Sequence, residues 1–276
     1  MTKPYAGLAL LTDLDGTLLM PDKTLSPEDA AAIADFRAKG GLFSVATGRG
    51  MQATKPYLEL LRPDYPAVMY NGALLYDAQK QETAATSHLP AEAGSLLREL
   101  MQAFPEVGAE VLDETGVYVI QDGAIEREHL AITHIPVVLK DFDTVRPEEC
   151  MKALFAGEPE DIARMLEYVK APRFAAVDMT RSHRWFLEIL PADTNKGTAL
   201  RKLREMIPSG TAVGAAGDFD NDIAMLREAD ICGCPADAQP AVKAAVRQCG
   251  GFISEKTCEN GFFADWIHEF IRRNTR

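Results

Sequence analysis

Residues 7–18 read Gly-Leu-Ala-Leu-Leu-Thr-Asp-Leu-Asp-Gly-Thr-Leu. The apolar run from Gly7 to Leu11 has the composition of a strand that is buried on both faces in a parallel sheet. Two carboxylates, Asp13 and Asp15, follow it directly, and open α/β sheets bind their ligands at the carboxyl ends of the strands. This stretch therefore predicts a parallel α/β core and also the edge of the sheet at which its site lies.

Strands and helices alternate on either side of this stretch. Ser26 and Pro27 are a cap residue and a first-turn proline, so they begin a helix, and Gly40-Gly41 ends it. The elements expected next are strands at 42–46 and 67–70 and a helix at 51–61. The alternation returns late in the chain, with helices at 196–206, after 220 and at 238–247, and strands at 211–216 and around 231. Such alternation is typical of a parallel sheet with right-handed crossovers.

The middle of the chain has a different pattern. Residues 110–121 alternate around a turn at 113–116, which predicts a hairpin. Further strands are expected at 150–155, 173–179 and 184–190, and helices at 91–104 and 161–170. The simplest account is an α/β core that is split by an inserted α+β domain.

The composition limits the classes of function. The chain has 276 residues, of which 47% are hydrophobic and 25% charged, as in globular proteins of one large or two modest domains. Its formal net charge of −12 argues against a nucleic-acid partner, because affinity for a phosphate backbone comes from clustered Lys and Arg. No apolar run approaches the about 18 residues of a membrane helix, and none has the layout of a signal peptide. We therefore expect a cytoplasmic protein with no membrane or nucleic-acid partner.

The chain has five cysteines, an odd number that fits reduced thiols better than a disulfide framework. Cys232 and Cys234 have the spacing of half a zinc site, but no second tight pair of Cys or His completes it. We therefore expect these two thiols to behave as small buried hydrophobes.

Asp13 and Asp15 have the spacing of a nucleophile and a general acid. Two carboxylates at positions i and i+2 of an extended chain point to the same side, so both can reach one substrate. Asp13 can attack phosphorus, while Asp15 can protonate the leaving oxygen and then deprotonate water. Gly16 permits a tight turn close to the ligand. An Asp-rich turn after a strand is common, but this five-residue pattern arises by chance about once in a few hundred chains of such composition, which favours a function.

Two further strand and helix ends carry polar groups. Thr47 follows the second expected strand and can donate to a phosphoryl oxygen, and Arg49, beyond Gly48, could pair with phosphate or with an acidic neighbour. Lys196 opens a helix, where a lysine can supply a point charge for a transferring phosphoryl group. Taken alone, Thr-Gly is usually a simple turn, and Lys196 could equally be exposed to solvent.

A second acidic cluster, residues 217–222, follows the late strand. Mg²⁺ takes oxygen ligands and needs only one or two protein carboxylates. We expect Asp218 to bind Mg²⁺ together with Asp13 and the main-chain carbonyl of Asp15. Asp222 is expected at the same metal site, as the group that orients a bound water or Lys196. Calcium is the poorer interpretation, because the cluster lacks the spacing and the glutamate of an EF-hand loop.

These four motifs, in this order, resemble those of the haloacid dehalogenase (HAD) superfamily. The matching residues are Asp13-Leu-Asp15-Gly-Thr, Thr47-Gly, Lys196 and Gly217-Asp218-Phe-Asp-Asn221-Asp222. Three further stretches look like the Cof-type phosphatases with a type-IIB cap: Asn71-Gly-Ala, Phe186-Leu-Glu-Ile-Leu-Pro and the run that ends at Met225. The resemblance spans nearly the whole chain.

The resemblance implies a fold and an activity. The fold would be a Rossmann-like core of residues 1–82 and 191–276 with an α+β cap of residues 83–190. The activity would be Mg²⁺-dependent hydrolysis of a small phosphorylated metabolite, of the sugar phosphate, FMN or pyridoxal phosphate (PLP) type, through an aspartyl-phosphate intermediate. The residues expected to contact substrate or phosphate are Gly16, Gly48, Arg49, Asn71 and Asn221.

Two other functions fit the same residues. A phosphomutase or phosphotransferase would use a sugar hydroxyl in place of water, and a regulatory protein could keep the fold without turnover, although the intact Asp13 and Asp15 disfavour the latter. A monomer or a weak homo-oligomer is expected. The cap carries no motif for one substrate, and we expect only one or two of its candidates to line the site: Arg146, Arg181, His183, Arg184 and Trp185. His134 is expected to be structural.

Overall fold

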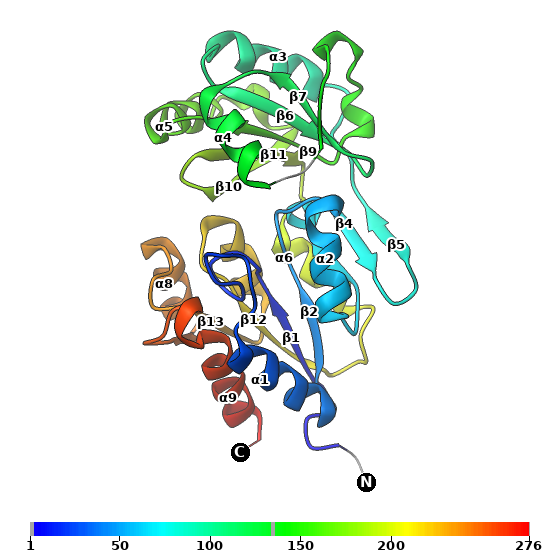
Figure 1. Ribbon diagram of the computed structural model, residues 1–276, viewed down its shortest axis with the longest axis vertical. Coiled ribbons are helices and arrows are strands. Elements are labelled where there is room, and N and C mark those ends of the chain that lie inside the picture. The colour runs from blue at the N-terminus through cyan, green and yellow to red at the C-terminus, as the bar shows by residue number, and fades with distance from the viewer. Residues whose placement is uncertain (1–2, 134–135, 276) are drawn as a thin grey trace.

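The computed structural model describes residues 3–133 and 136–275, and these form two lobes with both ends of the described chain in the lower one (Figure 1). The lower lobe contains the strands β1 (Leu8–Thr12), β2 (Leu42–Val45), β3 (Ala67–Met69), β4 (Leu74–Asp77), β5 (Glu82–Thr86), β12 (Ala212–Ala216), β13 (Ile231–Cys234) and β14 (Phe252–Ile253). Its helices are α1 (Pro27–Ala38), α2 (Met51–Leu61), α6 (Lys196–Arg204), α7 (Ile223–Glu228), α8 (Pro240–Gln248) and α9 (Phe262–Asn274).

The upper lobe contains the rest of the regular structure. Its strands are β6 (Gly108–Leu112), β7 (Val117–Gln121), β8 (Val137–Leu139), β9 (Lys152–Ala156), β10 (Val177–His183) and β11 (Phe186–Pro191), and its helices are α3 (Ala93–Ala103), α4 (Ala124–Thr133) and α5 (Pro159–Tyr168). The expected parallel core with an added α+β lobe is confirmed.

The core sheet has the strand order β14-β13-β12-β1-β2, and every neighbouring pair is parallel. β1 is central and buried along its whole length. Leu8 and Leu10 pack in the hydrophobic cluster that includes α1 and α9, while Ala9 and Leu11 pack in the cluster that includes α6, α7 and α8. Alternate side chains of a strand point to opposite faces, so a strand covered on both faces is apolar throughout. The pairing Thr12↔Ala216 brings the end of β1 beside the end of β12.

The N-terminus of α1 links two distant parts of the core. Ser26 caps α1 by accepting a hydrogen bond from Asp29 N at 3.0 Å, and its hydroxyl donates to Asp29 Oδ2. Asp29 Oδ1 accepts in turn from Ala264 N at 2.7 Å, in the first turn of α9. The buried Asp29 therefore joins the N-termini of α1 and α9.

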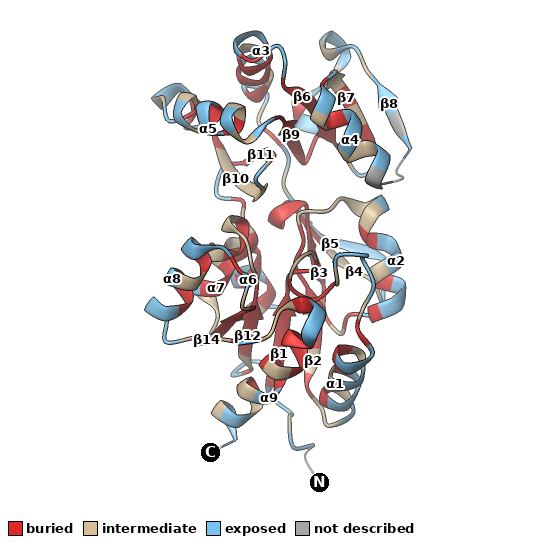
Figure 2. Ribbon diagram, turned by 60° about the vertical axis from the view of Figure 1, so that its left-hand side comes forward, coloured by how far each residue is buried: buried red, intermediate tan, exposed pale blue. Residues whose placement is uncertain are grey.

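The upper lobe, called the cap from here on, contains a six-stranded sheet in the order β10-β11-β9-β6-β7-β8. The sheet is antiparallel except for the pairing of β7 with β8. One face carries Ala109, Val111, Phe155 and Ile189, which pack in a cluster with side chains of α3 and α5. The opposite face turns toward the core, and several of its residues are buried as well (Figure 2). The cap thus presents a buried sheet face to the sheet edge that carries the Asp residues.

A small antiparallel sheet, β3-β4-β5, lies in the lower lobe, where Val68 of β3 forms a bridge with Ala46 at the end of β2. The proposed start of the cap at residue 83 falls inside β5, which pairs with β4, and Leu89 packs in the hydrophobic cluster of the cap. The division at residues 83 and 190 remains our proposal.

Local departures from the expected elements have physical reasons. The strand expected at 173–179 begins at Val177, because Pro172 starts a short 3₁₀ turn over Pro172–Phe174. The sequence analysis did not anticipate α4, α9 and the strands β4, β5, β8 and β14. Among the described residues, none of the helices has both the length and the apolar character needed to cross a membrane. His134 lies outside the residues that the structure describes.

Candidate active site

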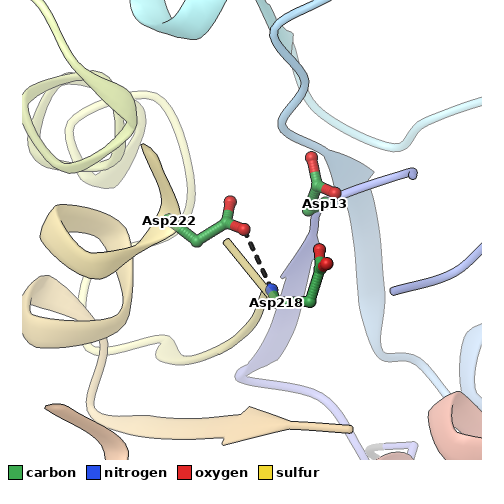
Figure 3. A group of neighbouring side chains, drawn as sticks. All are labelled: Asp13, Asp218 and Asp222. Carbon is green, nitrogen blue, oxygen red and sulfur yellow. Dashed lines mark hydrogen bonds between the residues drawn. The ribbon is translucent and has the colours of Figure 1, made fainter. Parts of the chain in front are cut away.

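Three carboxylates from two distant parts of the chain meet at the carboxyl edge of the core sheet. Asp13 follows β1, and Asp218 and Asp222 belong to the loop and 3₁₀ turn after β12; one carboxylate oxygen of each lies within 4.8 Å of the others (Figure 3). The parallel pairing of β1 with β12 produces this meeting, since both strands end at the same edge. The sequence-based expectation that Asp13 and Asp218 are neighbours agrees with this geometry.

Lys196 is fully buried at the same point. Its ammonium lies 2.6 Å from Asp13 Oδ1 and 2.7 Å from Asp222 Oδ1. Burial alone would lower the pKa of Lys196, but Asp13 and Asp222 outweigh that effect and raise it, so the group is an ammonium. The reading of Lys196 as a solvent-exposed lysine is therefore excluded.

The start of α6 fixes the position of Lys196. Asn195 caps the helix by accepting hydrogen bonds from the backbone N–H groups of Gly197 and Thr198, and the Thr198 hydroxyl accepts from Asn195 N in return. A Cβ on Gly197 would lie only 2.7 Å from the backbone of Ala224, so glycine allows α6 to pack directly on α7. These contacts hold the first helical residue, Lys196, toward Asp13.

The acidic groups are hard to ionise together. Burial raises the pKa of Asp13 to about 7; Lys196 opposes this, while Asp222 and Asp15 add to it. Burial, followed by the charges of Asp13 and Asp222, also raises the pKa of Asp218 well above its ordinary value. A divalent cation would relieve both effects, and the donors are the hard oxygens that Mg²⁺ prefers. The residues present therefore fit a Mg²⁺ site.

Asp218 is held in place from two sides. Thr17 Oγ1 donates to Asp218 Oδ1 at 3.0 Å. Gly16 has φ +75°, and a Cβ there would lie 2.5 Å from Asp218 Oδ2. Gly16 thus allows both the turn and the close approach of Asp218, and Thr17 is a site residue that the sequence analysis did not single out.

Both oxygens of Asp222 have partners within the protein. Oδ1 accepts from Lys196, and Oδ2 accepts from the backbone N–H groups of Asp218 (3.0 Å; Figure 3) and Phe219 (3.1 Å). Asp222 therefore orients Lys196 and shapes the Asp218 loop, which favours the orienting role over direct contact with a metal.

Asp15 is paired with cations. Arg49 donates from Nε to Asp15 Oδ2 at 2.6 Å and from Nη2 to Oδ1 at 2.7 Å, and Lys23 lies 2.7 Å from Oδ1. Burial tends to raise the pKa of Asp15, but Arg49 and then Lys23 outweigh it and lower the pKa to about 2. Of the two pairings left open for Arg49, the structure contains the one with an acidic neighbour. Lys23 lies in an exposed turn, and nothing in the sequence around it predicted its contact with Asp15.

The residues after β2 and β3 meet in one network. Asn221 Nδ2 donates to Asn71 Oδ1 at 2.9 Å, and Asn71 Nδ2 donates to Glu188 Oε2 of the cap at 2.9 Å. Gly48 lies against Asn71, since a Cβ would come within 3.1 Å of Asn71 Oδ1. Thr47 is buried at the same place, and its hydroxyl accepts from Arg49 N at 3.1 Å.

A cavity of about 340 Å³ joins these residues to the cap. Asp13, Asp15, Thr47 and Asp218 line its core side. Of the five cap candidates, His183 and Trp185 line it, whereas Arg181 forms an ion pair with Asp220, with Nε at 2.9 Å.

The cap also contributes charged residues that the sequence analysis missed: Glu110, Lys152 and Glu188. The signal was a single charged residue in an otherwise apolar strand: Glu110 and Glu188 lie inside β6 and β11, and Lys152 is the first residue of β9. Such a residue is rarely buried without a reason.

Comparison with known proteins gives the family. The sequence profile of the haloacid dehalogenase-like hydrolases matches residues 10–264. The chain belongs to this family. The resemblance that the four motifs predicted, to a Cof-type HAD phosphatase, is thereby confirmed.

The HAD hydrolase has curated relatives along most of its length. It is 29% identical to pyridoxal phosphate phosphatase YbhA of Escherichia coli K12, over 84% of this chain and 89% of the relative. It is 27% identical to 5-amino-6-(5-phospho-D-ribitylamino)uracil phosphatase YitU of Bacillus subtilis 168, over 84% and 86%. Among solved structures, the HAD subclass IIB sugar phosphatase BT4131 superposes with a TM-score of 0.80 at 20% identity, over 95% of this chain and 98% of that one. This last likeness supports the fold.

Proposed function

We propose that this HAD hydrolase removes phosphate from small phosphomonoesters with Mg²⁺ as cofactor, by way of a phosphoryl group carried on Asp13. The observation that carries the proposal is the convergence of Asp13 and Asp218 at the cavity, with the buried Lys196 ammonium 2.6 Å from Asp13 Oδ1. The named relatives, which include phosphatases of pyridoxal phosphate and of a phosphorylated ribitylaminouracil, support a phosphorylated metabolite as substrate.

The Asp13 and Asp218 side chains, with the main-chain carbonyl of Asp15, would hold the metal. When bound, Mg²⁺ supplies positive charge that offsets the repulsion between a carboxylate and a phosphate dianion. Lys196 and the hydroxyl of Thr47 would stabilise the charge on the phosphoryl oxygens, with contacts from Asn71, Asn221 and the backbone of Gly48.

The chain's own residues account for two balanced steps. In the first, a carboxylate oxygen of Asp13 forms a bond to phosphorus, the ester P–O bond breaks, and the leaving oxygen takes a proton from Asp15. In the second, Asp15 takes a proton from a water molecule, whose oxygen bonds to phosphorus as the Asp13–phosphorus bond breaks.

Asp15 must leave Arg49 to act as the acid, because Arg49 and Lys23 hold it as a carboxylate. A phosphate dianion offers Arg49 an alternative partner with the same bidentate geometry. Binding of substrate would therefore free Asp15 for protonation.

The test is phosphate release from a panel of sugar phosphates, FMN and pyridoxal phosphate, with Mg²⁺ or with EDTA. We expect Mg²⁺-dependent turnover in the wild type and a loss of at least about a thousandfold in Asp13→Asn. The exposed Asp237 supplies the matched control Asp237→Asn, which should keep full activity.

Two results would overturn the proposal. One is wild-type turnover in folded Asp13→Asn. The other is phosphate released in ¹⁸O-labelled water without any label, because a transferase that passes the phosphoryl group to a sugar hydroxyl would leave water unused.

A further inference from the structure

The core-facing side of the cap sheet carries a row of charged residues. In the register of the strands, Leu154 of β9 lies opposite both Glu110 of β6 and Glu188 of β11. Residues opposite one another in an antiparallel pair share a face, and Lys152, two residues from Leu154, shares it too. Glu110, Lys152 and Glu188 therefore face the same cavity, and all three line it.

Two members of the row satisfy one another. Lys152 and Glu188 form a buried ion pair. The Lys152 ammonium also donates to the carbonyl of Gly48 at 2.8 Å, and Glu188 accepts from Asn71, so both charges have partners in the core as well. This pair ties the cap to the phosphate end of the cavity.

Glu110 is different. Its side chain is only 2% exposed, and within the described part of the chain Glu110 Oε2 has no hydrogen-bond partner. The carboxyl beside it is Glu126 of α4, whose oxygens are both without partners in the same described part. Gly108 lets α4 approach this closely, because a Cβ there would collide with Glu126 Cβ. These are buried acceptors beside one another, an arrangement that is costly unless one of the two carboxyls carries a proton.

The two carboxyls hold a proton between them. Burial, followed by Glu110, raises the pKa of Glu126 to about 10, and burial also raises the pKa of Glu110. Glu126 is therefore neutral near pH 7 and can donate to Glu110, which leaves Glu110 as the acceptor toward the cavity.

The cavity wall near the row is mostly aromatic and apolar, and Glu128 lines the cavity as well. His129, His183 and Phe186 pack on one another, with ring centroids 4.7 Å apart for His129–Phe186 and 5.4 Å apart for His183–Phe186. Burial lowers the pKa of His129 to about 4 and also lowers the pKa of His183, so both rings are neutral at neutral pH. Apolar side chains complete the wall: Leu112, Val117, Ile125, Leu154 and Trp185.

We propose that Glu110, backed by Glu126, binds an N–H group of the leaving group, and that this leaving group is a planar, nitrogen-bearing ring held against the aromatic wall. The inference rests on the proposed phosphatase function and specifies its substrate class. A sugar would present several hydroxyls to a wall in which apolar and aromatic side chains outnumber polar ones such as Gln52, Glu128 and Ser182. A ring with one amino or ring N–H group satisfies Glu110 and buries its faces on apolar atoms.

The test compares substrates that differ in one group. The probes are 2-phenylethyl phosphates that carry an amino or a methyl group at ring position 3 or 4, because amino and methyl are similar in size. We expect kcat/KM of the wild type, with Mg²⁺, to be at least about tenfold higher for the amino compound at one of the two positions, as for a hydrogen bond to a buried acceptor.

Variants assign the preference to Glu110. Glu110→Met should reduce the amino-to-methyl ratio to about one while the methyl compound is still hydrolysed, because an apolar side chain of similar length replaces the acceptor. Glu110→Gln should reduce the ratio at least about threefold, since an amide oxygen is a weaker acceptor than a carboxylate. If thermal melting shows that Glu110→Met does not fold, the amino-to-methyl ratio of Glu110→Gln decides whether the preference depends on Glu110. The exposed Glu92, whose side chain makes no cap hydrogen bond, gives the control Glu92→Gln with the wild-type ratio.

The inference is overturned if the wild type shows no amino preference at either position, if folded Glu110 variants keep the wild-type ratio, or if glucose 6-phosphate is a better substrate than both amino compounds. The proposed function fails in a different way: no phosphomonoester, methyl compounds included, releases phosphate in a Mg²⁺-dependent manner.

Discussion

Asp13 and Asp15 are two carboxylates two residues apart, and their neighbours give them different properties. Burial acts on both in the same direction, yet Arg49 and Lys23 lower the pKa of Asp15 to about 2, while the pKa of Asp13 rises to about 7 beside Asp222 and Asp15 in spite of Lys196. The sequence predicted which residue types stand at the strand ends. It could not predict their pairing, because the choice of Arg49 between phosphate and Asp15 depends on side-chain distances, and Lys23 reaches Asp15 from an unremarkable turn.

Gly16 allows a direct prediction at this scale. Gly16→Ala places a Cβ at φ +75° and 2.5 Å from Asp218 Oδ2, whereas Gly210→Ala places one at φ +80° in open space. Both changes should cost about 1 kcal/mol or more in the free energy of unfolding, from the left-handed backbone alone. Only Gly16→Ala should also lose activity, by about a hundredfold or more, because it displaces Asp218.

Urea unfolding and steady-state kinetics of the two variants check this prediction. Equal activity in the two alanine variants would mean that Asp218 does not depend on the close approach of Gly16.

At the scale of the elements, most of the core could be predicted, and the cap less well. β1 and α2 have strong signals, because a strand covered on both faces is wholly apolar and the helix of residues 51–61 has an amphipathic pattern. α9 was missed although Phe262, Trp266 and Phe270 recur at helical spacing. The face of the cap sheet that meets the core was missed for a physical reason. Glu110, Lys152 and Glu188 become one row only through strand register, which joins residues far apart in the chain.

The N-terminal cap of α6, Asn195, allows a prediction about this helix. Asn195→Ala should lower the free energy of unfolding by about 1 kcal/mol through loss of the cap, and kcat should fall about tenfold or more because Lys196 is the first residue of the helix. Ser26→Ala removes the cap of α1 and should cost a similar free energy with little change in kcat, because no residue of α1 lines the cavity.

Thermal or urea unfolding, with kcat measured at saturating substrate, separates the two effects. If both variants lose stability and activity in proportion, the cap of α6 has no special role in positioning Lys196.

At the scale of the whole molecule, the carboxyl groups that the proposed function needs lower the stability of the folded protein. Without a cation, the fold holds three carboxyl groups around one ammonium. The folded-state pKa of Asp13, about 7, lies above the ordinary value of 3.8, so ionising Asp13 destabilises the fold; this cost is absent below about pH 4 and complete above about pH 7.

Asp13→Asn should therefore melt at a higher temperature than the wild type in EDTA at pH 8, by several degrees, and by less at pH 5. Saturating Mg²⁺ should raise the Tm of the wild type and change that of Asp13→Asn much less. Calorimetry of both proteins, with the exposed Asp237→Asn as control, measures these shifts. Identical Tm values for Asp13→Asn and wild type in EDTA at both pH values would contradict the account.

The pairing of β1 with β12 also has a consequence for how the protein folds while it is synthesised on the ribosome. β1 emerges first, but its partner strand and Asp218 are about two hundred residues away, with the entire cap between them. Because domains fold as units during synthesis, the cap can fold before β12 has been synthesised and has paired with β1. Nascent chains that stop before residue 218 should therefore contain a folded cap and no capacity for phosphoryl transfer.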